Sequence, residues 1–104
     1  MKKYLYFAKT ATDTMCLPAD ELIGMEIDSG SEAIHLTFTD KGGGIGGSTV
    51  IQIGTGTANQ AAVVIKAIAE EIRVGKEPFI VVADDNNSVY LHANIDQVDA
   101  ALEL

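Results

Sequence analysis

One long segment of the chain has the periodicity of an amphipathic helix. The segments around it either alternate apolar and polar residues or are continuously apolar, as is typical of strands. Within residues 61–74, apolar side chains recur at helical spacing: Ala61, Val64, Ile65, Ile68 and Ile72. The charged side chains of this segment fall on the opposite face: Lys66, Glu70 and Arg73. Residues 57–60 have the spacing of a capping box and Gly75 supplies a stop, so the sequence predicts a helix of roughly 16 residues.

Strands are predicted on both sides of this helix. The clearest alternation turns every second side chain inward: Ile34, Leu36 and Phe38. In residues 23–27 the inward positions are Ile23, Met25 and Ile27, and Gly24 is a point where the strand can bend sharply. Further strands are predicted over residues 4–9, 15–17, 49–53, 79–83 and 89–93. A helical turn at residues 18–22 and a short C-terminal helix capped by Asn94 or Asp96 complete the elements.

This order of elements predicts a single domain over residues 1–104. The fold class is mainly β with one long helix (α+β), and its sheet is mostly antiparallel and curled. Hydrophobic residues make up 47% of the chain, more than a monomer of this size is expected to hide. Residues 79–83 are apolar on both faces of their strand, which is typical of a strand at the centre of a sheet or at a subunit contact. We therefore expect a homo-oligomer, with these candidates for the subunit interface: Phe79, Ile80, Val81 and Val82.

Five glycines crowd into residues 42–47, which invites comparison with a phosphate-binding loop. The P-loop pattern requires a lysine after the glycines and a helix directly behind them. Here Lys41 precedes the glycines, and a strand follows them. We therefore expect the run to be a flexible hairpin tip between two strands.

Catalytic and metal-binding residues form no recognisable motif in the sequence. Residues 84–88 resemble the start of a calcium loop, but Val89 and Ile95 stand where that loop needs glycine and glutamate. The two histidines, His35 and His92, have no third ligand at suitable spacing. We expect no enzyme activity, no metal, no cofactor and no small-molecule substrate.

The charge of the chain disfavours nucleic acid as a partner. Its formal net charge of −8 repels a phosphate backbone at long range. The lone Cys16 fits a reducing compartment. No run approaches the ~20 apolar residues of a membrane span. We expect a cytoplasmic protein with no membrane partner.

Aromatic side chains near the basic N-terminus offer a local exception. Exposed rings beside lysines can stack on single-stranded bases, and the rings available are Tyr4, Tyr6, Phe7 and Tyr90. Packing in a core or an interface is the simpler explanation of aromatic residues in strands. The candidates for nucleic-acid contact are Lys2, Lys3, Tyr4, Lys41, Tyr90 and His92.

Three segments together resemble a known family: MKKYLYF at the start, then CLPADELIGMEID, then PFIVVADDNNSVYLHANI. They are similar to small Sm-like and LSm-like proteins of marine cyanophage, known mainly from ocean metagenomes. The similarity covers most of the chain and is weakest through the glycine run. It implies a small, strongly bent antiparallel β-barrel with an inserted amphipathic helix. It also implies homo-oligomeric rings with a role in nucleic-acid processing in the infected host cell.

The sequence departs from the Sm pattern at the RNA site. Sm proteins bind RNA with an Asp/Asn-containing loop and an Arg-Gly loop, whereas the single arginine here, Arg73, precedes Val74. The RNA-binding residues of the family are therefore not transferred. The leading hypothesis is a non-enzymatic, ring-forming Sm-like protein that binds RNA or single-stranded DNA. The alternative, which the net charge favours, is a phage structural or protein–protein interaction module without nucleic-acid binding.

Overall fold

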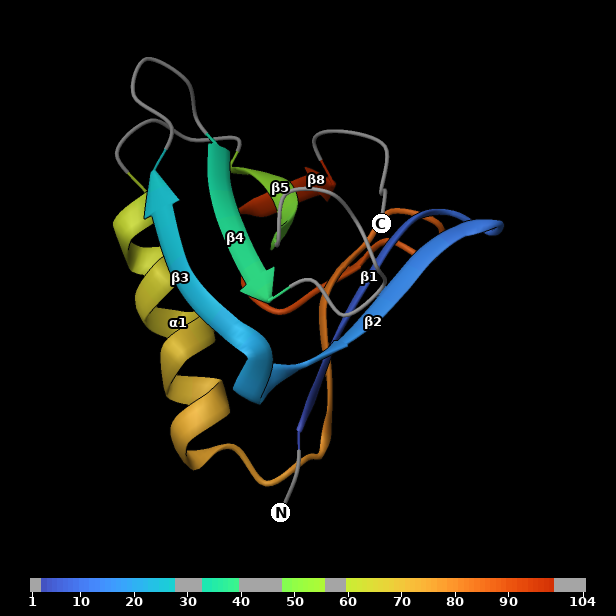
Figure 1. Cartoon of the computed structure of the whole chain (residues 1–104). Coiled ribbons are helices and arrows are strands. Elements are labelled where there is room, and N and C mark those ends of the chain that lie inside the picture. The colour runs from blue at the N-terminus through green and yellow to red at the C-terminus, as the bar shows by residue number, and fades with distance from the viewer. Residues whose placement is uncertain (1–2, 28–32, 40–47, 56–59, 99–104) are drawn as a thin grey trace.

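The structure is a computed structural model that describes residues 3–27, 33–39, 48–55 and 60–98 (Figure 1). Its strands are β1 (Tyr4–Thr10), β2 (Asp13–Pro18), β3 (Leu22–Ile27), β4 (Ala33–Thr39), β5 (Ser48–Thr55), β6 (Phe79–Asp84), β7 (Val89–Tyr90) and β8 (Ile95–Val98). The short 3₁₀ helix η1 (Ala19–Glu21) joins β2 to β3, and the helix α1 (Ala61–Val74) follows β5. The predicted fold class, mainly β with one long helix, is confirmed.

The described strands form two four-stranded sheets and no closed barrel. Sheet A has the strand order β2-β1-β6-β7, and sheet B has the order β3-β4-β5-β8. β1 and β6 run parallel, whereas the other pairings of these strands are antiparallel. Parallel strands need a long crossover connection, and here it contains β2 to β5 and α1. The prediction of mostly antiparallel strands is therefore confirmed, with one parallel pairing at the centre of sheet A.

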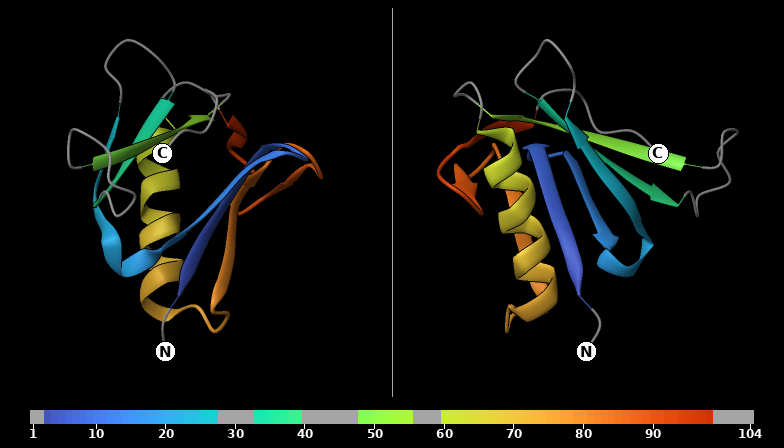
Figure 2. Two further views of the ribbon diagram at one scale, coloured as in Figure 1. Left: turned by 45° about the vertical axis from the view of Figure 1, so that its right-hand side comes forward. Right: turned by 90° about the vertical axis from the view of Figure 1, so that its left-hand side faces the viewer.

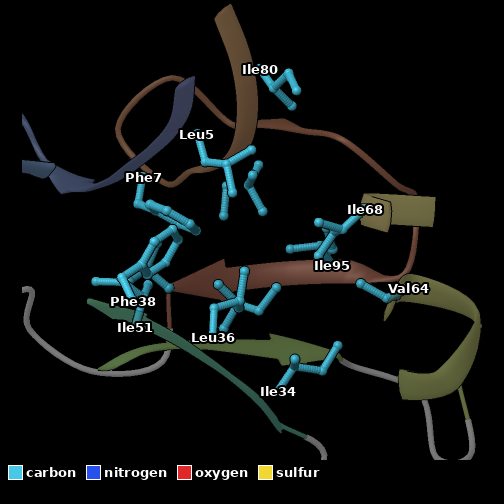
Figure 3. Close-up of a cluster of buried hydrophobic side chains, with 14 of the residues drawn as sticks. Leu5, Phe7, Ile34, Leu36, Phe38, Ile51, Val64, Ile68, Ile80 and Ile95 are labelled. Atoms are coloured by element: carbon cyan, nitrogen blue, oxygen red, sulfur yellow. The ribbon is translucent and has the colours of Figure 1, made fainter. Parts of the chain in front are cut away.

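The hydrophobic core lies between the two sheets. Leu5 and Phe7 of β1 lie across from Leu36 and Phe38 of β4 (Figure 3). The rings of Phe7 and Phe38 meet edge to face, with centroids 6.2 Å apart, an arrangement that stabilises beyond the area it buries. The inward alternation predicted for β4 is confirmed, because Ile34, Leu36 and Phe38 are all fully buried.

Helix α1 stands between the sheets where they spread apart, as the left view of Figure 2 shows. It buries Ala61, Val64 and Ile68 against the core, as its helical spacing predicts. The helix ends at Val74, and the N–H of Gly75 donates to the Glu71 carbonyl at 2.9 Å. The predicted stop is confirmed. Residues 57–59 of the expected capping box lie outside the described residues, and Gln60 makes no side-chain cap.

The N-terminal segment holds the C-terminal end of α1. Lys3 Nζ donates to the carbonyl oxygens of Glu71, Ile72 and Gly75 at 3.1, 2.8 and 2.6 Å. The last carbonyls of a helix lack partners within the helix and carry the negative end of its dipole, so an ammonium group stabilises them. Glycine is required at position 75, because a Cβ there would lie 2.5 Å from the Glu71 carbonyl oxygen.

The strands on either side of the glycine run pair as predicted. β4 and β5 are antiparallel, and their register runs to Thr39 opposite Ser48. The hairpin is therefore confirmed. The glycine run itself falls in residues 40–47, outside the described residues.

Strand β3 departs from the predicted alternation. Its register against β4 shifts between Leu22 and Gly24, and a shift of this kind turns side chains to the other face. Leu22 and Met25 pack against the core, whereas Ile23 is 64% exposed. The register shift adjoins Gly24, where a bend was predicted, and the inward positions predicted for Ile23 and Ile27 are wrong.

The predicted C-terminal helix is a strand over the residues that the structure describes. β8 pairs with β5, and Val98 lies opposite Ile53. Ile95 and Val98 are buried while the two residues between them are exposed. This spacing resembles one turn of a helix, but it arises from a register shift in the β5–β8 pair. Residues 99–104 lie outside the described residues.

We predict that Lys3→Met lowers the free energy of unfolding by about 2 kcal/mol, because three carbonyls at a helix end lose a charged donor. Urea denaturation followed by far-ultraviolet circular dichroism measures this change. Lys76→Met removes an exposed lysine just beyond α1 and is the control, expected to change stability by less than about 0.5 kcal/mol. Equal stability of Lys3→Met and the wild type would contradict the role assigned to Lys3.

Candidate functional site

The outer face of sheet A carries side chains that the core does not use. On β1 and β6 the core positions are Leu5, Phe7, Ile80 and Val82. Successive side chains of a strand point to opposite faces, so the residues that alternate with these face outward. They are Tyr4, Tyr6, Phe79 and Val81, and we call them the aromatic face.

The strand register brings these four side chains together. Parallel pairing places Tyr4 opposite Phe79 and Tyr6 opposite Val81. The rings of Tyr6 and Phe79 have centroids 5.3 Å apart and planes tilted by 40°, within the range of favourable aromatic pairs. Phe79 is nevertheless 51% exposed and Tyr4 38%. Covering this face would remove a large apolar area from water, which is favourable.

The aromatic face and its neighbours on β2 carry no charge. Cys16 pairs with Tyr6 in the register and extends the face by one strand, and Pro18 pairs with Tyr4. The thiol of Cys16 is exposed, but partial burial raises its pKa above the usual value. The thiol therefore stays protonated at neutral pH and is a weak nucleophile. The face is a neutral surface on a chain whose net charge is −8.

The predicted nucleic-acid contacts that the structure describes are spread over different parts of the molecule. Tyr4 belongs to the aromatic face. Lys3 does not extend that face with a positive charge, because an ammonium has three donors and all three have carbonyl acceptors at the end of α1. Lys2 and Lys41 lie outside the described residues. The cationic part of the predicted site is therefore not assembled beside Tyr4.

Tyr90 and His92 lie near the turn that follows β6. Tyr90 packs against the core, and its hydroxyl donates to Asp85 Oδ1 at 2.9 Å. The backbone N–H of Asn94 donates to His92 Nδ1 at 3.1 Å. Both side chains thus make local structural contacts and do not join the aromatic face.

Two adjacent aspartates organise this turn. Asp84 is buried and accepts hydrogen bonds from the backbone N–H and the side-chain Nδ2 of Asn87, at 3.1 and 3.0 Å. Asp84 is the first residue of the segment compared with a calcium loop, and its carboxylate is therefore hydrogen-bonded within its own turn. Burial, and then the hydrogen bond to Asp85 and its negative charge, raise the pKa of Tyr90 to about 12.

The predicted subunit-interface residues divide between two environments. Phe79 and Val81 lie on the aromatic face, whereas Ile80 and Val82 belong to the core. Tyr6 was named among the rings that could stack on bases but not among the interface candidates, and Cys16 was named for neither role. The strict alternation of side chains along β1 indicates that Tyr6 shares a face with Tyr4. The position of Cys16 beside Tyr6 follows only from the pairing of β1 with β2.

The structure offers no metal site in the part of the chain that it describes. There, no group of three or more His, Cys, Asp or Glu residues is placed to hold a metal ion. His35 lies on β4, opposite Glu26 of β3 and Gln52 of β5. His92 lies beyond β7, so the two histidines belong to different parts of the fold.

Comparisons with known proteins find no similar protein that indicates a function. No family model matches the chain, and no match is found among curated proteins or solved structures. Among the described residues, no helix is long and apolar enough to cross a membrane.

We predict that Asp85→Asn lowers the pKa of Tyr90 from about 12 toward its ordinary value of 10.0, because it removes a charge that disfavours tyrosinate. In the wild type, the raised pKa means that neutral Tyr90 contributes stability fully below pH 10.0, and that this stability is lost as the pH rises through about 12. Ultraviolet titration of tyrosinate in a Tyr4→Phe/Tyr6→Phe background isolates Tyr90. An unchanged pKa in Asp85→Asn would contradict the role given to this carboxylate.

Proposed function

We propose that the protein is a non-enzymatic assembly module whose copies associate through the aromatic face. The observation that carries this proposal is the half-exposed ring of Phe79, paired with Tyr6 on an uncharged sheet surface. Removing apolar surface from water contributes about 25 cal/mol per Å². Aromatic side chains are also enriched among the residues that dominate binding at interfaces.

A second copy of the chain suits this face because the face is neutral. Two copies with a net charge of −8 repel one another wherever charged surfaces meet. Contact through the aromatic face brings no like-charged side chains of its own together. Two sheets stacked face to face lie ~10 Å apart, a gap that interdigitating side chains fill. The same four residues from each copy can meet in a two-fold contact, the commonest symmetry of homo-oligomers.

Binding of single-stranded nucleic acid is the second candidate, and the same ring pair favours it. Exposed aromatic rings on a sheet stack with bases irrespective of sequence. The backbone phosphates, however, need cations nearby. Lys3 and Lys9 both donate to backbone carbonyls instead. We therefore rank this candidate below self-assembly.

We further propose, from the resemblance, that copies paired through the aromatic face belong to a ring of Sm-like subunits of phage origin. A two-fold contact closes at two copies, so this ring needs a second contact elsewhere on each copy. What supports this in the fold is the corner at η1. There the chain passes from β2 at the edge of sheet A to β3 at the edge of sheet B, as one strongly bent strand would. Native mass spectrometry tests the ring: assemblies of more than two copies are expected, and a dimer as the largest species would contradict it.

We predict that Phe79→Thr raises the dissociation constant of self-association at least about tenfold, because it removes an aromatic anchor. Threonine keeps the strand propensity of the position. Sedimentation equilibrium over a range of concentrations measures the constant. Val50→Thr removes a side chain of similar exposure from sheet B, 50% against 51%, and should associate as the wild type does.

A wild type that stays monomeric at every concentration would contradict self-assembly. An equal loss of association in Val50→Thr would contradict the assignment to the aromatic face. Fluorescence anisotropy with single-stranded RNA and DNA oligomers, at low and high salt, tests the second candidate. Salt-sensitive binding that Phe79→Thr abolishes would favour nucleic acid, and absence of binding would eliminate it.

A further inference from the structure

Two charged side chains associated with sheet A hold the backbone of one residue in sheet B. Lys9 Nζ, from β1, donates to the Val98 carbonyl oxygen at 2.9 Å. The Val98 N–H donates to the Asp85 carboxylate, at 3.1 Å to Oδ1 and 3.0 Å to Oδ2. Asp85 is itself fixed beside β1, since its backbone N–H donates to the Ala8 carbonyl at 2.7 Å. Side chains of opposite charge therefore engage both polar main-chain groups of Val98.

These hydrogen bonds lie on the outer edge of β8. β8 is the last strand of sheet B, and within the described residues it pairs only with β5. In an antiparallel pair, a residue directs both its N–H and its C=O either toward the partner strand or away from it. Val98 lies opposite Ile53 of β5, but its own polar groups go to Lys9 and Asp85. The N–H and C=O of Val98 therefore point away from β5, toward the side of β8 on which a further strand would otherwise bind.

An edge strand with open main-chain groups is a template for another chain. Another copy of this protein carries the same β8 edge, so two such edges could pair with one another in antiparallel fashion. We propose that Lys9 and Asp85 form an edge clamp that closes β8 to strand addition by a second copy. The clamp occupies the N–H and C=O that the second strand would need. It acts at the β8 edge and does not rest on the association proposed for the aromatic face.

The experiment compares the wild type with Lys9→Met, Asp85→Asn and the double variant. Hydrogen exchange read by nuclear magnetic resonance follows the Val98 amide, and sedimentation velocity follows the mass of the assembly. The double variant is expected to exchange this amide at least about tenfold faster, because a charged hydrogen bond is lost. It is also expected to form larger species than the wild type at the same concentration.

The matched control is Lys66→Met/Glu77→Gln, which makes the same change of charge at exposed positions and should leave both measurements unchanged. The comparison is repeated in a Phe79→Thr background, where growth at the β8 edge should persist although the aromatic face is weakened. If circular dichroism shows that the double variant is unfolded, the same two measurements on the single variants test the proposal. Unchanged exchange at Val98, or faster exchange without larger species, would overturn the proposal.

Discussion

The structure depends on β6, a strand that is apolar on both of its faces. Ile80 and Val82 build the core, and Phe79 and Val81 emerge on the other side of the sheet. Strands buried on both faces normally occur where both faces of a sheet are covered. In this fold one face of sheet A meets the core, and its aromatic face is left to water. The residues of β6 therefore contribute both to the core and to the proposed assembly surface.

Electrostatic contacts with the backbone join the parts of the fold. Lys3 binds the last carbonyls of α1, and Lys9 and Asp85 bind Val98 of β8. The chain has 7 basic residues against 15 acidic ones, so lysines used for internal contacts leave the surface more strongly acidic. This distribution of charge explains why the aromatic face suits a neutral protein surface better than a phosphate backbone. The lysines that stabilise the fold therefore have donors engaged by backbone carbonyls and not directed at a phosphate backbone.

Local periodicity predicted the elements whose neighbours in sequence decide their structure. α1 and the β4–β5 hairpin are of this kind, because their patterns repeat within a few residues. The parallel pairing of Tyr4 with Phe79 joins distant segments, and no local pattern signals it. A helix was expected near the C-terminus because Asn94 or Asp96 can cap one, whereas residues 95–98 form β8, which pairs with the distant β5. Lys3 was a candidate for nucleic-acid contact because aromatic residues follow it in the sequence, whereas its acceptors lie at the C-terminal end of α1.

The reactivity of Cys16 tests the central claim without any substitution. Its thiol is exposed and adjoins Tyr6, so it becomes covered if copies associate through the aromatic face. The rate of reaction with an excess of a thiol reagent is measured over a range of protein concentrations, alongside the average mass by light scattering. The account predicts that the rate per molecule falls as the associated fraction rises. A rate that stays constant while the mass grows would place the interface elsewhere and contradict the account.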